Sequence, residues 1–262
     1  MNTSLLFFIL IFYIFLIKQA NTLPAQGECG KPIISPNIDG STLNKRIING
    51  QLNVPNSWPW MASIRAVFPD GTLSSHFCGG MLIYNNIVLT AAHCLLKYKA
   101  SSLAVVIGIN NVSTALATVP NLVYYVNKTK YHDLFNINNS PLKYDIGLIQ
   151  LKKNVTFTSN VSLICLPSSA SDSGNVNNKK VVLTGWGSKD GLNLVSSISQ
   201  DLLQTKLSVI NGDPSCISNG INYDPNTVYC VLDLVSNPKS NACFGDSNYL
   251  IFFSLNYNNN LL

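Results

Sequence analysis

The chain has 262 residues, of which 47% are hydrophobic and 11% charged, and its formal net charge is +5. This length suffices for one large domain or two small ones with a substantial core. Because the charge is mild and no stretch is rich in Lys or Arg, the composition argues against a nucleic-acid partner.

The N-terminus is an unbroken apolar run at residues 5–17. This run is too short to span a bilayer and fits the h-region of a secretory signal peptide, which we place at residues 1–26. A buried N-terminal helix is the alternative. No later run approaches the length of a membrane span, so we expect a secreted, extracellular protein without one.

Cysteines and glycosylation sequons are consistent with secretion. The seven cysteines include no C-x-x-C pair, which favours disulfides over a zinc site. Because seven is odd, one cysteine must remain unpaired. Asn-x-Ser/Thr sequons, of which we expect only some to be glycosylated, are candidate surface positions. They begin at Asn111, Asn127, Asn138, Asn154 and Asn160.

A polar stretch at residues 27–46 indicates a linker or pro-segment rather than a packed element. From Ile47 onward, short apolar or alternating runs are broken by turn residues, and helical periodicity is scarce. This pattern predicts an all-β fold, an antiparallel sandwich or barrel. The Ser- and Asn-rich residues 168–178 suggest a boundary between two halves. Examples of these runs, which we expect to be strands, lie at residues 61–64, 77–83, 87–90, 103–108, 147–151, 181–187 and 228–232.

Three short motifs carry residue types suited to nucleophilic catalysis. LTAAHC contains His93, YDIGLIQL contains Asp145 and CFGDS contains Ser247. A serine hydroxyl needs a base to take its proton, a histidine can serve as that base, and a carboxylate can orient the histidine. Each residue alone has an ordinary structural explanation, but together they stand in one of the known chain orders of a serine triad. The backbone N–H groups of Gly245 and Ser247 are candidate oxyanion-hole donors.

Nine segments between Cys29 and Ser247 occur in the order of one protease family. They are CGKPIISPN, RIING, SWPWMASI, FCGGMLI, LTAAHC, DIGLIQL, CLP, GWG and ACFGDS. Together they resemble a trypsin/chymotrypsin-type serine protease zymogen, most closely a chymotrypsinogen-like one. The resemblance implies two antiparallel six-stranded β-barrels, at residues 47–167 and 168–262, with the site between them. It implies a serine-type endopeptidase that needs no cofactor and acts on protein or peptide substrates.

The resemblance also implies activation by proteolysis. A trypsin-like protease would cut between Arg46 and Ile47, and the new Ile47 amine would pair with Asp246 and order the oxyanion turn. Protease inhibitors are expected partners.

The resemblance assigns most of the cysteines to disulfides. It pairs Cys78 with Cys94, Cys29 with Cys165, and Cys216 with Cys230. Cys243 is then left unpaired, because its counterpart in the family follows the serine.

Substrate preference in this family depends on the residue six positions before the nucleophile, here Asn241. Trypsin-like enzymes carry an aspartate at this position, which receives a basic side chain. A neutral Asn241 therefore predicts no strong preference for a basic P1 residue, unless it is only a turn residue. We expect no metal, because residues 106–121 contain no Asp or Glu to form a calcium loop.

The chain departs from the family pattern after Ser247. The family continues with Gly-Gly-Pro and further strands, whereas this chain continues with Asn248 and Tyr249. We therefore expect an incomplete second barrel and a non-family tail at residues 248–262, which we interpret as translated intron or a mispredicted gene end. An incomplete barrel predicts weak or absent activity of the chain as written. The alternative functions are a catalytically inactive homologue serving as a binding or decoy protein, and a secreted adhesion module.

Overall fold

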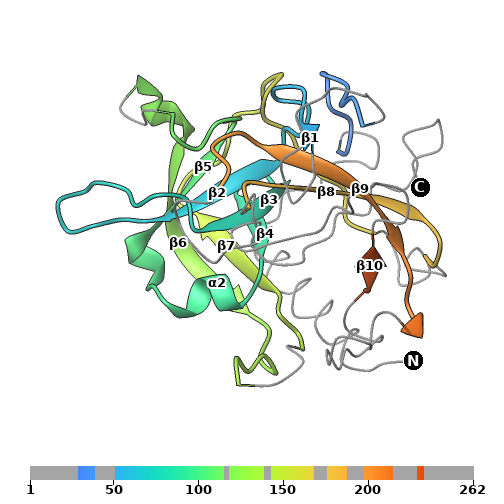
Figure 1. The fold of residues 1–262 in the computed structure, drawn as a ribbon. Helices are drawn as coiled ribbons and strands as arrows, with labels where there is room; N and C mark the ends of the chain where they lie inside the picture. Colours follow the sequence, from blue (N-terminus) through green and yellow to red (C-terminus); the bar gives the residue numbers. More distant parts are fainter. Residues whose placement is uncertain are drawn as a thin grey trace.

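The structure is a computed structural model that describes residues 29–38, 51–114, 118–138, 143–167, 176–187, 198–214 and 229–232. Strands dominate these ranges, and their arrangement is shown in Figure 1. The strands are β1 (Gln51–Leu52), β2 (Met61–Ala66), β3 (Cys78–Tyr84), β4 (Ile87–Thr90), β5 (Leu103–Ile107), β6 (Val123–Tyr131), β7 (Gly147–Leu151), β8 (Lys180–Gly185), β9 (Leu203–Val209) and β10 (Val231–Leu232). The helices are α2 (His93–Leu96) and the 3-10 turns η1 (Ala100–Ser102) and η3 (Pro120–Leu122).

The first half of the chain forms a closed antiparallel barrel in the order β2-β3-β4-β7-β6-β5. Closure pairs every strand on both sides and leaves no open sheet edge. The predicted runs at 87–90 and 147–151 coincide with β4 and β7. The expected all-β, chymotrypsin-type architecture is therefore confirmed.

The core of this barrel explains why apolar runs predicted most of its strands. Every residue of β2, β3, β4 and β5 is buried. Leu82, Ile107 and Ile149 are fully inaccessible to solvent and belong to one hydrophobic cluster. Burying such a side chain stabilises the fold by about 1.5–3 kcal/mol.

Strand β6 escaped prediction because most of its side chains face solvent. Only Val126 is buried in this strand, while Asn127, Lys128 and Lys130 are exposed. Its backbone pairs with β5 on one side and β7 on the other. Barrel closure, rather than local hydrophobicity, therefore makes this segment a strand.

The second half of the described chain forms a sheet centred on β9. Strand β8 pairs along one edge of β9, while β1 and β10 pair with opposite ends of its other edge. A small cluster that includes Val181, Leu183 and Leu207 packs beneath it. The predicted incompleteness of the second barrel concerns residues 233–262, which lie outside the described residues, so it stays a prediction.

Residues 29–38 contain no helix or strand but are attached to both sheets. A disulfide joins Cys29 to Cys165, as the resemblance implied. The backbone carbonyl of Asn37 accepts a hydrogen bond of 2.7 Å from the Gln204 side chain in β9. This segment therefore bridges the end of the first barrel and the second sheet.

The two halves also meet through buried indole groups. Trp58 Nε1 donates to Gln204 Oε1 at 2.8 Å, and Trp186 Nε1 donates to the Asn110 carbonyl at 3.0 Å. Within the described ranges, no helix has the length and apolar character needed to cross a bilayer.

Candidate active site

His93 and Asp145 are far apart in the sequence, and strand pairing brings them together. His93 opens α2, shortly after β4, and Asp145 lies just before β7. β4 and β7 are antiparallel with Thr90 opposite Gly147, so the residues following Thr90 lie beside those preceding Gly147. The register of one strand pair thus positions both side chains at the same end of the barrel.

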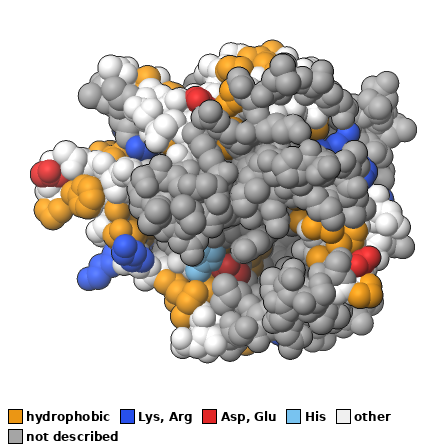
Figure 2. Space-filling view, in the orientation of Figure 1, with side chains coloured by type: hydrophobic (Ala, Val, Ile, Leu, Met, Phe, Trp, Pro, Cys, Tyr) orange, Lys and Arg blue, Asp and Glu red, His pale blue; other side chains and the backbone are white. Residues whose placement is uncertain are grey.

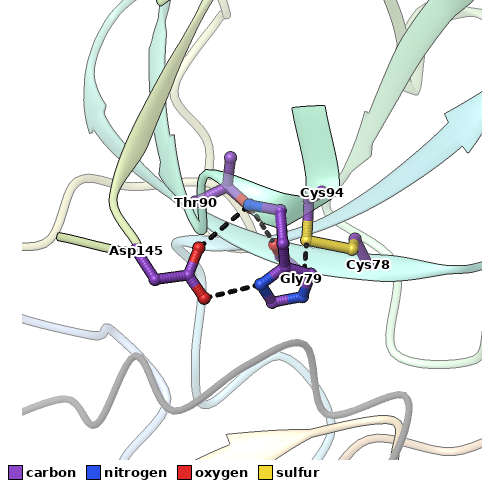
Figure 3. A network of polar contacts seen from close by, with 6 residues as sticks. Cys78, Gly79, Thr90, Cys94 and Asp145 are labelled. Atoms are coloured by element: carbon purple, nitrogen blue, oxygen red, sulfur yellow. Dashed lines mark hydrogen bonds and ion pairs between the residues drawn. A yellow bond between two sulfur atoms is a disulfide. The ribbon is translucent and has the colours of Figure 1, made fainter. Parts of the chain in front are cut away.

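Two hydrogen bonds join Asp145 to His93 (Figure 3). Oδ2 of Asp145 lies 2.6 Å from Nδ1 of His93, and Oδ1 accepts from the His93 backbone N–H at 2.9 Å. An ionised carboxylate only accepts hydrogen bonds, so Nδ1 carries the proton. The other ring nitrogen, Nε2, then carries no proton and can accept a proton.

The pair is partly exposed, as a base that acts on a substrate must be. The side chain of His93 is 25% exposed and that of Asp145 is 17% exposed. Figure 2 shows a histidine beside an acidic side chain on the face of the molecule viewed there. The arrangement can take a proton from a hydroxyl presented to Nε2.

A disulfide between Cys78 and Cys94 braces the segment that carries His93. This second implied pairing is also present, and the Cys94 sulfur lies 3.8 Å from His93 Nε2. Cys78, His93 and Cys94 have potential metal ligands within 4.8 Å of one another. Both sulfurs are consumed by the disulfide, so these residues do not suit a metal ion.

Gly147 allows α2 to pack closely against β7. A Cβ atom at this position would lie 2.6 Å from Cδ1 of Leu95. Leu95 is buried and belongs to the same helix as His93. The missing side chain of Gly147 therefore leaves room for the buried Leu95 side chain of α2 beside β7.

Tyr144, directly before Asp145, has a left-handed backbone with φ of 59°. A non-glycine residue in this region is uncommon and costs energy, so surrounding contacts must hold it. Its ring stacks on His132 with centroids 4.5 Å apart. Burial lowers the pKa of His132, which favours the neutral ring. The motif YDIGLIQL contains Tyr144 and Gly147 but assigned them no role, and His132 lies in no motif, because their importance depends on these contacts.

The remaining predicted site residues lie outside the described residues. They are Arg46, Ile47, Cys216, Asn241, Cys243, Gly245, Asp246 and Ser247. Cys230 is disulfide-bonded, and its predicted partner Cys216 is in that group. The structure therefore brings together two of the three predicted triad residues, and the position of Ser247 stays a prediction.

Comparison with known proteins identifies the family of this fold. The family described as Trypsin matches residues 47–247, a range that begins at the predicted new N-terminus and ends at the predicted nucleophile. The chain belongs to the trypsin family of serine proteases.

Several curated proteins are similar to the chain. It is 33% identical over 198 residues to a chymotrypsin of Phaedon cochleariae, covering 75% of this chain and 63% of that protein. It is 36% identical over 146 residues to the clotting factor G beta subunit of Tachypleus tridentatus, covering 54% and 44% respectively. It is 31% identical over 173 residues to the human transmembrane protease serine 11B, covering 65% and 36%. The chain thus spans less than two thirds of the length of each of these relatives.

Proposed function

We propose that the chain is a secreted serine endopeptidase zymogen whose triad is Ser247, His93 and Asp145. The observation that carries the proposal is the hydrogen bond between His93 Nδ1 and Asp145 Oδ2 in a member of the trypsin family. In this mechanism Nε2 of His93 takes the proton of the Ser247 hydroxyl as its oxygen attacks the substrate carbonyl. The same nitrogen then gives that proton to the departing amine, and water releases the acyl group.

Asp145 acts by orientation and charge. Its two oxygens hold the backbone and the ring of His93, which fixes the tautomer that leaves Nε2 unprotonated. The carboxylate also stabilises the imidazolium that forms when Nε2 takes the proton. The N–H groups of Gly245 and Ser247 would stabilise the negative oxygen of the tetrahedral intermediate.

Activation by cleavage after Arg46 belongs to the same proposal. The freed Ile47 amine would pair with Asp246 and order the oxyanion turn, with a trypsin-like protease as the activator. Because Cys29 is bonded to Cys165, residues 27–46 would remain attached as a pro-segment after this cut. The protease domain would then comprise barrels at residues 47–167 and 168–262.

Substrate preference and secretion are further parts of the proposal. A neutral Asn241 at the base of the specificity pocket favours P1 residues that are not basic. Residues 1–26 would direct secretion, and the exposed sequon residues Asn127 and Asn154 support glycosylation. Protein substrates and protease inhibitors are the expected partners.

Covalent labelling tests the proposed activity. The full chain would be cut after Arg46 with trypsin, freed of trypsin, and exposed to a fluorophosphonate probe. Labelling that disappears in Ser247→Ala, with hydrolysis of peptide p-nitroanilides carrying Phe or Ala at P1 faster than those carrying Arg, would support the enzyme, and the predicted incompleteness of the second barrel implies that both signals are weak. A folded, cleaved chain that takes up no probe would overturn the enzymatic proposal and favour the inactive homologue that binds other proteins.

A further inference from the structure

A buried cationic side chain lies in the first barrel, away from the His93–Asp145 pair. Arg65 is in β2, and 5% of its surface is exposed. Burial lowers the pKa of its guanidinium, but an arginine remains charged at neutral pH. A charge removed from water normally has a partner of opposite charge, because desolvation alone is costly.

The contacts of Arg65 are all with neutral acceptors. Its Nε donates to Ser63 Oγ at 3.3 Å, its Nη1 to the Ser74 carbonyl at 3.4 Å, and its Nη2 to the Val112 carbonyl at 2.5 Å. A guanidinium has five N–H donors, so these three bonds leave two without an acceptor among the described residues.

No carboxylate in the described part of the chain forms an ion pair with Arg65. Two carboxylates from the neighbouring loops form hydrogen bonds with residues other than Arg65. Asp70 accepts from Thr72, and Asp201 accepts from Asn111. The positive charge therefore has no countercharge among the described residues.

Arg65 lines an open cavity of about 750 Å³. This volume is within the range of sites that hold small ligands or side chains. Its walls combine polar groups with apolar side chains, among them Ser74, His76, Val112, Tyr125 and Ile198. A ligand that suits this lining has a negative group for Arg65 and apolar atoms around it.

We propose that this cavity binds the carboxylate of an aspartate or glutamate side chain of a polypeptide ligand. Guanidinium and carboxylate match in shape and form strong paired hydrogen bonds. A single arginine suits one carboxylate, whereas phosphorylated motifs are commonly recognised by clusters of arginines. The apolar walls leave room for the residues flanking the acidic one.

The cavity is connected through the chain to the segment that carries His93. One wall is formed by the segment 71–76, in the hairpin that projects from the barrel between β2 and β3 (Figure 1). This segment leads to Cys78, which is bonded to the neighbour of His93. The carboxylate site itself uses neither His93 nor Asp145, so it does not depend on catalytic activity.

The small number of arginines permits a direct test. The chain contains only Arg46 and Arg65. In the full chain labelled with ¹⁵N-arginine, the Nε–H region of the NMR spectrum should show two signals, and Arg46→Lys identifies the one from Arg65. The probes are Ac-Ala-Glu-Ala-NH₂, its twin Ac-Ala-Gln-Ala-NH₂, and free glutarate.

We expect the glutamate peptide to shift the Arg65 signal in a saturable manner. The glutamine peptide should bind with an affinity at least about tenfold lower. The Arg46 signal should not move. No shift with either peptide, or equal affinity for both, would overturn the proposal. Glutarate binding as tightly as the glutamate peptide would keep the carboxylate site but overturn its assignment to a polypeptide.

A variant adds a second measurement. Arg65→Lys keeps the charge but loses the forked donor geometry, so we expect it to weaken binding of the glutamate peptide about tenfold. Tryptophan fluorescence would measure this binding. The peptide comparison is made on unchanged Arg65, so the test does not depend on the folding of this variant.

Discussion

Substituting Gly147 by alanine tests whether packing between α2 and β7 sets the His93–Asp145 geometry. The added Cβ would lie 2.6 Å from Leu95 Cδ1, whereas carbon atoms in contact are about 3.5–4.0 Å apart. One side must therefore move by about 1 Å. The displaced atom is the end of the Leu95 side chain, but Leu95 is buried and β7 is paired on both edges, so we expect α2 to move with that side chain.

The magnitude follows from this displacement. Overpacking of this kind costs about 1–3 kcal/mol of unfolding free energy. A shift of about 1 Å would also stretch the 2.6 Å bond between His93 and Asp145 beyond hydrogen-bond range. Misplacement of a catalytic group by that distance can reduce turnover about 100-fold.

Urea unfolding and p-nitroanilide hydrolysis would measure the two effects of Gly147→Ala. Leu95→Ala removes the clashing atom and is the matched control. Although Leu95→Ala alone should cost about 2–5 kcal/mol, the double variant should be more stable than the sum of the singles by about 1 kcal/mol or more. Strictly additive free energies, or a Gly147→Ala protein with unchanged stability and turnover, would refute the packing argument.

Three further predictions concern the surroundings of this site. Asp145→Asn should leave the fold intact and lower kcat by about 10⁴-fold, the effect known for this triad substitution in the serine protease family; full turnover would remove Asp145 from the triad. Replacing Cys78 and Cys94 by alanine removes a disulfide between residues 16 positions apart and should lower the unfolding free energy by about 3 kcal/mol. Urea unfolding would measure this loss, and an unchanged midpoint would contradict the bracing role. Because burial lowers the pKa of His132 below its ordinary 6.5, the unfolded chain takes up the proton first, and stability should fall as the pH drops below that value. His132→Gln should reduce this loss between pH 7 and pH 5, and identical pH profiles would count against it.

The sequence alone predicted strands that coincide with short apolar runs. The runs that became β4 and β7 are apolar except for Thr90 and Gln150, because a barrel core requires mostly apolar residues there. It missed β6 and β9, whose sequences VYYVNKTKY and LQTKLSV are interrupted by polar residues. Those segments become strands because they pair with strands distant in the chain, and local composition does not predict that pairing.

The proposed triad residues illustrate the same division. Motif order in the sequence selected His93 and Asp145, because catalysis restricts which residue types can serve. Their 2.6 Å contact exists because Thr90 pairs with Gly147, and that register belongs to the barrel as a whole.

Arg65 and Tyr144 show what only the tertiary structure decided. In the sequence, Arg65 is an ordinary charged residue in an alternating run, and Tyr144 is an aromatic residue before an aspartate. Folding buries Arg65 without a countercharge among the described residues, and it holds Tyr144 at a positive φ against His132. Residue type determines which chemistry is possible, but burial and strain arise from contacts between segments far apart in the chain, so only the folded protein reveals them.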